Sequence, residues 1–315
     1  MVGELKIFAG RASENLAEKI CIHLAMPLGT RTVKQFSNDN TFVMITDNVR
    51  ECDVFVIQTS CPPVDHNLME LLITIDALRR ASAKRITAVL PLYPYARSDK
   101  KDQPRIPITA RLVADLLTTA GADRIITIDL HSPQIQGFFT IPLDHLTAAD
   151  LLYSYIAEKN ISDLVVVATD AGFAKEASVY ARWLNVPLAI MDKRRNGNDD
   201  QATVHHFIGN VTGKNVVIFD DEIDTGGTIK ETVKALRKAG AKDVYIGCTH
   251  AVFSGPAVDR LRECHATELI VTDTVPLPQN HSLECLTVLS VAPMLAEAIK
   301  RIHDGESVST LFKKK

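Results

Sequence analysis

Residues 216–228 read Val216-Val217-Ile218-Phe219-Asp220-Asp221-Glu222-Ile223-Asp224-Thr225-Gly226-Gly227-Thr228 and join an apolar run, two acids and a turn-forming loop. The apolar run is long enough for a strand buried on both faces and too short for a helix, and we expect the strand to end at Phe219. The periodic residues 229–236 predict a helix after the loop. The stretch therefore predicts a strand, a loop and a helix in succession, as in α/β proteins.

The polar residues of this stretch have the chemistry of a sugar-phosphate site. Backbone N–H groups of the loop Asp224, Thr225, Gly226, Gly227 and Thr228 would converge on an anion, and the helix N-terminus adds partial positive charge. Asp220 and Asp221 would repel a phosphate, but they can accept hydrogen bonds from two neighbouring sugar hydroxyls. Together these features predict binding of a phosphorylated ribose. The structural alternative is an ordinary strand-to-helix turn with solvated acids.

Similar apolar runs alternate with helical patterns along the whole chain. The predicted strands are 54–57, 86–90, 125–128, 164–167, 188–191, 216–219 and 244–247, and the predicted helices are 67–82, 108–120, 173–184 and 226–239. This alternation predicts an α/β fold of mostly parallel sheets with helices on both faces. A chain of 315 residues favours two domains, with a boundary near 148–150.

Composition excludes several classes of partner. The net charge of -3 and a pI of about 6.4 give no general attraction to nucleic acid or an anionic membrane, so we expect neither as a partner. Six scattered cysteines without zinc spacing favour reduced thiols in a cytoplasmic protein. The N-terminus does not have the pattern of a signal peptide, and no run reaches membrane-spanning length.

Three further segments resemble a known family. They are Pro94-Tyr95-Ala96-Arg97-Ser98-Asp99-Lys100-Lys101, Asp129-Leu130-His131-Ser132-Pro133-Gln134-Ile135-Gln136-Gly137-Phe138-Phe139 and Met191-Asp192-Lys193-Arg194-Arg195. They look like signature segments of the ribose-phosphate diphosphokinases, and 216–228 resembles the phosphoribosyl diphosphate motif of type I phosphoribosyltransferases. The resemblance implies two tandem type I phosphoribosyltransferase-like domains, 1–148 and 149–291, with the C-terminal helix 292–315 joining the first. It also implies diphosphoryl transfer from ATP to ribose 5-phosphate.

The resemblance also implies roles for individual residues. Lys193 and Arg195 would stabilise the transition state, and His131 and Asp170 would be associated with Mg²⁺. The ribose 5-phosphate residues would be Asp220, Asp221, Asp224, Thr225, Gly226, Gly227 and Thr228. The ATP residues would be Phe36, Asn38, Asn40, Arg97, Ser98 and Asp99. Implied partners are a homo-oligomer, commonly a hexamer, and phosphate and ADP as allosteric effectors.

Two departures from the family pattern keep an alternative open. Asn38-Asp39-Asn40 replaces the usual Asp-Gly-Glu or Asp-Gly-Asn, and loss of the glycine is expected to change the allowed backbone. Phe173-Ala174-Lys175-Glu176 replaces a commoner glycine and arginine pattern. These departures motivate a second hypothesis, a non-catalytic regulatory homologue that binds phosphorylated ribose and joins active subunits. A third, a phosphoribosyltransferase, would need no ATP, and the Arg97 segment argues against it.

Overall fold

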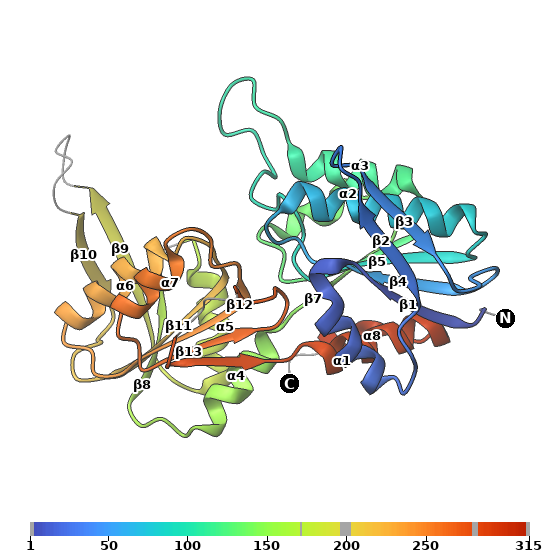
Figure 1. Cartoon of the computed structure of the whole chain (residues 1–315). Coiled ribbons are helices and arrows are strands. Elements are labelled where there is room, and N and C mark those ends of the chain that lie inside the picture. Colours follow the sequence, from blue (N-terminus) through green and yellow to red (C-terminus); the bar gives the residue numbers. More distant parts are fainter. Residues whose placement is uncertain (1–2, 171, 196–202, 279–282, 313–315) are drawn as a thin grey trace. The chain divides into compact units, whose positions relative to one another are not determined.

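The computed structural model of the chain describes residues 3–170, 172–195, 203–278 and 283–312, and the side chains of 193–195, 203–206, 310 and 312 lie outside this description. It divides into two compact units (Figure 1). The first unit comprises Met1–Thr147, Thr274–Pro276 and Ser290–Lys315, and the second comprises Ala148–Asp273 and Leu277–Leu289. The C-terminal helix therefore belongs to the first unit.

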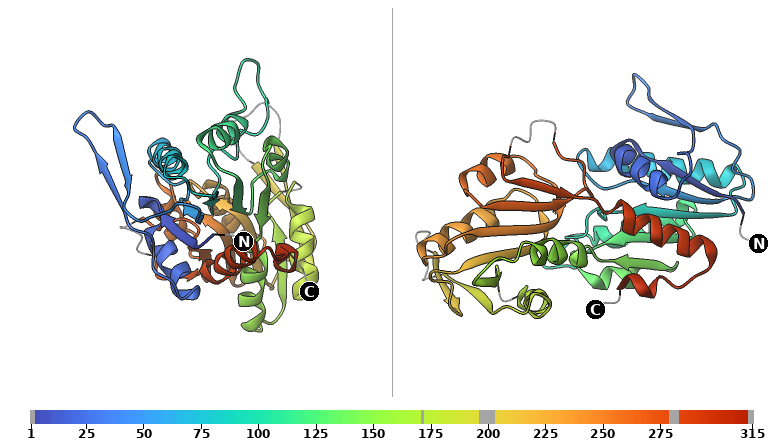
Figure 2. Two further views of the ribbon diagram at one scale, coloured as in Figure 1. Left: turned by 90° about the vertical axis from the view of Figure 1, so that its right-hand side faces the viewer. Right: turned by 90° about the horizontal axis from the view of Figure 1, so that it is seen from below.

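The first unit is built on a parallel five-stranded sheet of order β1-β4-β5-β6-β7, with a separate antiparallel hairpin, β2–β3. Its strands are β1 (Leu5–Ala9), β2 (Arg31–Gln35), β3 (Thr41–Ile45), β4 (Asp53–Ile57), β5 (Arg85–Leu90), β6 (Arg124–Ile128) and β7 (Leu143–Leu146). Its helices are α1 (Glu14–His23), α2 (Val64–Arg80), α3 (Thr109–Ala120) and α8 (Ala292–Asp304), with 3₁₀ turns η1 (Arg11–Ser13), η2 (Pro133–Phe138) and η3 (Val308–Phe312). Figure 2 shows α8 beside α1, in agreement with their contacts.

A buried carboxylate ties α8 to this sheet. Asp53, the first residue of β4, is fully buried. It accepts hydrogen bonds from Arg85 Nε at 2.7 Å and Arg85 Nη2 at 2.5 Å, and it contacts His303 Nδ1 at 2.8 Å. Arg85 also donates to the carbonyl of Ile302. Arg85 is the first residue of β5, and Ile302 and His303 lie near the end of α8. The network around Asp53 therefore connects β4, β5 and α8.

The second unit contains a seven-stranded sheet of order β10-β9-β8-β11-β12-β13-β14, in which only the β9–β10 pair is antiparallel. Its strands are β8 (Leu164–Ala168), β9 (Leu188–Arg195), β10 (Thr203–Ile208), β11 (Asn215–Ile223), β12 (Val244–Ala251), β13 (Glu268–Thr272) and β14 (Leu286–Leu289). Its helices are α4 (Ala149–Glu158), α5 (Ala174–Leu184), α6 (Gly227–Lys238) and α7 (Ala257–Glu263).

Alternate residues of β11 enter two separate cores of this unit. Ile218 packs in a cluster with residues of α6 and α7, whereas Val217 and Phe219 pack in a cluster with residues of α4 and α5. This is the alternation expected of a strand covered by helices on both faces. The predicted α/β architecture is confirmed. No helix among the described residues is long and apolar enough to cross a membrane.

Candidate active site

The carboxylate pair lies inside a strand rather than after it. β11 continues through Asp220 and Glu222 to Ile223, so the expected end at Phe219 is wrong. The reason is that β12 is also long and continues to pair with β11, matching Asp220 with Cys248 and Glu222 with His250. The two acids therefore lie within a paired strand, and a hydrogen bond between their side chains keeps the two carboxyl groups close together.

The loop after β11 has the backbone of an anion site. Gly226 has φ +70° and is the N-cap of α6. A glycine supplies no side-chain acceptor, and the start of α6 has no side-chain cap hydrogen bond, so its first N–H groups point toward whatever lies at the helix N-terminus. Thr225 and Thr228 are exposed beside it. This arrangement suits a phosphate.

A neighbouring loop and helix hold this loop in place. Arg260 Nη1 donates to the carbonyl of Thr225 at 3.0 Å, and the N–H of Ser254 donates to the carbonyl of Asp224 at 2.9 Å. A Cβ added at Gly227 would lie 3.5 Å from Arg260 Nη1, so the guanidinium adds positive charge next to the start of α6. Sequence reasoning did not find Arg260, because nothing in the sequence around it on α7 points to the loop.

The surroundings of Asp220 disfavour its ionised form. Burial, together with the hydrogen bond and charge of Asp221, raises the pKa of Asp220 well above its ordinary value. Burial beside these acids also raises the pKa of the fully buried Cys248 thiol. A ligand that brings hydroxyl donors or a cation to the acids would favour their ionised form.

The two predicted metal-associated residues lie in different units. Asp170 follows β8 in the second unit, and its Oδ1 accepts the N–H of Phe173 at 2.9 Å just before α5 begins. His131 follows β6 in the first unit and is exposed. In the parts of the chain that the structure describes, no group of three or more His, Cys, Asp or Glu side chains could hold a metal ion.

The basic segment lies in a strand hairpin. β9 was expected to end at Met191, but it continues to Arg195 because β10 pairs with it, Lys193 opposite His205 and Arg195 opposite Thr203. The side chains of Lys193 and Arg195 lie outside the described residues. The backbone nevertheless places both residues toward the end of a two-stranded ribbon.

The predicted ATP residues Phe36, Asn38 and Asn40 form the tip of the β2–β3 hairpin. Phe36 is 54% exposed, and its ring centroid lies 5.8 Å from that of Phe42. Asp39 adopts φ +69°, the left-handed conformation that a glycine would supply, and accepts a hydrogen bond from Gln35. Aspartate tolerates this region, so the hairpin tip adopts a conformation that is also open to glycine.

Arg97, Ser98 and Asp99 lie in the loop between β5 and α3. Arg97 is exposed and Asp99 is partly buried. Ser98 has a structural contact, because the N–H of Thr109, at the start of α3, donates to Ser98 Oγ at 3.4 Å. The N–H of Ser98 also donates to the carbonyl of Tyr95 at 2.8 Å. These bonds fix the turn that carries Arg97.

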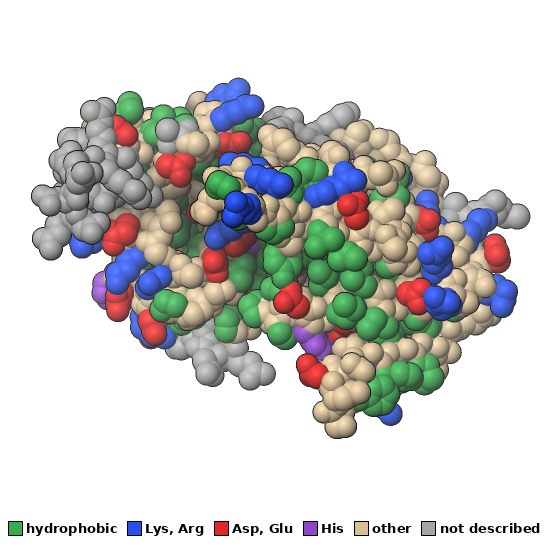
Figure 3. All heavy atoms as spheres, turned by 90° about the horizontal axis from the view of Figure 1, so that it is seen from above, with side chains coloured by type: hydrophobic (Ala, Val, Ile, Leu, Met, Phe, Trp, Pro, Cys, Tyr) green, Lys and Arg blue, Asp and Glu red, His purple; other side chains and the backbone are tan. Residues whose placement is uncertain are grey.

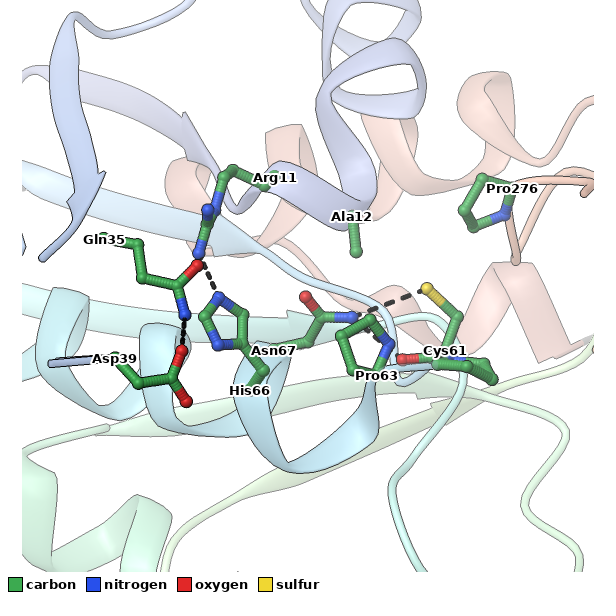
Figure 4. A pocket seen from close by; sticks show the side chains of 10 residues that line it. Arg11, Ala12, Gln35, Asp39, Cys61, Pro63, His66, Asn67 and Pro276 are labelled. Atoms are coloured by element: carbon green, nitrogen blue, oxygen red, sulfur yellow. Dashed lines mark hydrogen bonds between the residues drawn. The ribbon is translucent and has the colours of Figure 1, made fainter. Parts of the chain in front are cut away.

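A cavity of about 650 Å³ lies between the hairpin and the first turn of α2 (Figure 4). Gln35 and Asp39 line it from the hairpin, His66 and Asn67 from α2, and Arg11 from η1. Arg11 donates through its backbone N–H and its Nε to the fully buried carboxylate of Glu70, at 2.8 and 2.6 Å. Because Glu70 compensates the charge of Arg11, the cavity offers hydrogen bonds more than net positive charge.

Comparison with known proteins gives one consistent result. The model for the N-terminal domain of ribose phosphate pyrophosphokinase matches residues 5–121, and that for the phosphoribosyl synthetase-associated domain matches residues 199–313. The ribose-phosphate pyrophosphokinase of Caldanaerobacter subterraneus is 50% identical over 309 residues, which cover 98% of each chain. The one from Rhodopirellula baltica is 48% identical over 99% of each chain. The crystal structure of phosphoribosylpyrophosphate synthetase from Mycobacterium smegmatis superposes with a TM-score of 0.90 at 49% identity, covering 96% of this chain and 99% of that one.

Proposed function

This chain belongs to the ribose-phosphate pyrophosphokinase family, and we propose that it transfers the β,γ-diphosphoryl group of ATP to the 1-hydroxyl of ribose 5-phosphate. The products are 5-phosphoribosyl 1-diphosphate and AMP, which feed nucleotide biosynthesis. The sugar oxygen attacks the β-phosphorus, the bond from that phosphorus to the oxygen shared with the α-phosphate breaks, and the hydroxyl proton is released. The observation that carries the proposal is full-length similarity to relatives of this name, with an anion loop directly after a carboxylate pair.

The second unit provides the ribose 5-phosphate site. The 5-phosphate binds at the start of α6, against N–H groups of the loop from Asp224 to Thr228, with Arg260 adding positive charge. Asp220 and Asp221 accept hydrogen bonds from the 2- and 3-hydroxyls. Because burial and the neighbouring Asp221 raise the pKa of Asp220, hydroxyl donors from the sugar are expected to lower that pKa.

The first unit provides the nucleotide side. Phe36 presents an exposed aromatic ring for the base, and Asn38 and Asn40 offer amide groups at the same hairpin tip. Arg97 lies in a turn held by Ser98 and followed by Asp99, where a guanidinium can bridge phosphate oxygens or stack on the base. The domains proposed from the sequence, 1–148 with 292–315 and 149–291, thus divide nucleotide and sugar recognition.

Mg²⁺ is the divalent ion that we propose for the transfer. The fit rests on donor chemistry, since a carboxylate is a hard oxygen ligand and the N–H of Phe173 orients that of Asp170. Asp170 of the second unit would bind magnesium directly, and His131 of the first unit would act through water or on a phosphate oxygen. One carboxylate is enough for such a site, because magnesium usually takes one or two carboxylates and completes its shell with water and substrate phosphates. When bound, the ion neutralises charge on the diphosphoryl oxygens.

Lys193 and Arg195 are the catalytic residues of the proposal. They are two residues apart on β9. Cationic groups that meet charge developing in the transition state are the main source of rate enhancement in phosphoryl transfer.

A homo-oligomer, with a hexamer as the expected size, is part of the proposal. Leu112 and Leu116 are exposed one turn apart on α3, and Met69 is exposed on α2. Figure 3 faces this side of the first unit and shows hydrophobic side chains among the charged ones. An apolar face of this kind suits burial against a second copy. Phosphate and ADP are proposed effectors, and the unpaired cysteines suit a cytoplasmic location.

Phosphorus NMR with Mg²⁺, ATP and ribose 5-phosphate, with and without inorganic phosphate, tests the function. AMP together with a diphosphate on the sugar is the expected result, and Lys193→Ala or Arg195→Ala should lower kcat by about 10²- to 10³-fold with ribose 5-phosphate binding kept. Arg182→Ala, an exposed arginine on α5, is the control. Sugar-phosphate binding by calorimetry without any AMP would favour the regulatory homologue instead.

A further inference from the structure

The residue directly before the carboxylate pair takes part in an unusually close aromatic stack. Phe219 is fully buried, and its ring lies parallel to that of Tyr180 on α5, with centroids 3.9 Å apart and an interplanar angle of 8°. Tyr180 is in turn packed edge-on against Trp183, and Trp183 contacts Tyr153 of α4. A chain of aromatic rings therefore runs from the two helices to the strand that carries the acids.

Gly247, which lies beside Phe219 on the neighbouring strand β12, leaves room for the phenylalanine ring. In the β11–β12 register Phe219 lies beside Gly247, and a Cβ added to Gly247 would lie 2.7 Å from Cδ1 and 2.8 Å from Cε1 of the ring. Real Cβ atoms do not approach so closely, so Phe219 fits only because Gly247 lacks a side chain. The ring is confined between Tyr180 and the backbone of β12.

Strand alternation connects this stack to the site. Phe219 and Asp221 are two residues apart on β11, so strand alternation puts both on the α5 side of the sheet. The same helix α5 begins just after the loop that holds Asp170. A shift of α5 against β11 would therefore displace Asp221 and the Asp170 loop relative to each other.

We infer that Tyr180 is a positioning residue, which holds Asp221 in register for the ribose hydroxyls by locking Phe219 against Gly247. This inference rests on the proposed function of the same site. Tyr180 itself makes no contact with the sugar in this arrangement and acts through Phe219. The ring matters rather than the hydroxyl, because stacking is what fixes Phe219.

Calorimetric affinity for ribose 5-phosphate and steady-state kinetics of Tyr180→Leu and Tyr180→Phe test the inference. Tyr180→Leu should raise both Kd and KM for ribose 5-phosphate by about tenfold, the upper end of the worth of an aromatic pair, with KM for ATP unchanged. Tyr180→Phe keeps the ring and should remain within about twofold of the unaltered protein. Tyr153→Leu, which removes a ring from the same aromatic chain without touching Phe219, is the control and should leave Kd unchanged.

A second pair of variants covers the case in which Tyr180→Leu does not fold. Gly247→Ala and Phe219→Leu should each raise Kd for ribose 5-phosphate, the first because the added methyl pushes the ring out of place and the second because it removes the ring. Equal effects of Tyr180→Leu and Tyr153→Leu, or an unchanged Kd in Tyr180→Leu or Gly247→Ala, would overturn the inference. An unaltered protein that forms no AMP would refute the proposed function separately, since the Kd comparison needs no turnover.

Discussion

Replacing Gly226 by alanine tests whether the left-handed residue at the start of α6 is what shapes the phosphate loop. Gly226 has φ +70°, and a Cβ built on it would meet only the carbonyl oxygen of Ala257 at 3.4 Å and atoms farther away. Steric crowding is therefore small. The cost of Gly226→Ala comes almost entirely from holding an L-residue in the left-handed region.

That cost is about 1–2 kcal/mol for a residue with a Cβ. If the loop keeps its conformation, the whole amount is lost from the free energy of unfolding. If the loop relaxes to relieve the strain, the N–H groups turn away from the phosphate, and the same amount appears as a loss of ribose 5-phosphate affinity of about 5- to 30-fold. Urea unfolding of Gly226→Ala measures the loss of stability, and calorimetry of the same variant measures the loss of ribose 5-phosphate affinity.

Gly213→Ala is the matched control. Gly213 has φ +69°, nearly the same conformation, and no atom within 4 Å of an added Cβ, but it lies in the turn before β11. It should lose about 1–2 kcal/mol of unfolding free energy and no affinity. If Gly226→Ala changes neither stability nor affinity, or if Gly213→Ala weakens sugar binding equally, the role assigned to the loop conformation is wrong.

Three further predictions concern charge and backbone. Asp53→Asn should lower the free energy of unfolding by about 3–5 kcal/mol in urea, because it leaves Arg85 without its buried partner, whereas Asp163→Asn at an exposed pair should give no measurable change. Asp39→Gly should leave Tm nearly unchanged, whereas Asp39→Val should cost about 1–2 kcal/mol at φ +69°; equal Tm values would contradict this. The pKa of Asp220 is higher in the folded than in the unfolded protein. Its contribution to the free energy of unfolding is therefore complete below the pKa of the unfolded state and is lost as pH rises through the pKa of the folded state. The Tm of Asp220→Asn relative to the unaltered protein should therefore increase with pH, and a flat difference would refute the raised pKa.

The sequence predicts which segments become strands better than where the strands end. Apolar runs mark the buried part of β11, β9 and β12, but each strand extends past its run, to Ile223, Arg195 and Ala251. The extension depends on pairing with a neighbouring strand. Such pairing uses backbone N–H and C=O groups, so it includes polar and apolar residues alike. Local hydrophobicity does not indicate which strand will pair with a segment. The apolar runs therefore predict Asp220, Asp221 and Lys193 outside strands.

The same limit applies to the site. The phosphate loop could be predicted because its glycine, threonine and acid residues are adjacent in sequence. Arg260, Tyr180 and Gly247 could not, because their importance arises from contacts with Thr225 and Phe219 across the fold. A tyrosine at helical spacing and a glycine in an apolar run are each ordinary features of a core, and only their packing on one ring gives them a role.

The two departures that motivated a regulatory homologue leave the backbone of the site intact. Asp39 occupies the left-handed position where the family usually has glycine, so the hairpin tip keeps its turn. Phe173, in the other altered segment, donates its N–H to Asp170 just before α5 begins. What differs is side-chain chemistry at exposed positions such as Glu176, and that can alter nucleotide or phosphate preference without removing the carboxylate pair or the anion loop. The structural motive for a non-catalytic protein is therefore weak, and the departures are better tested as determinants of substrate preference.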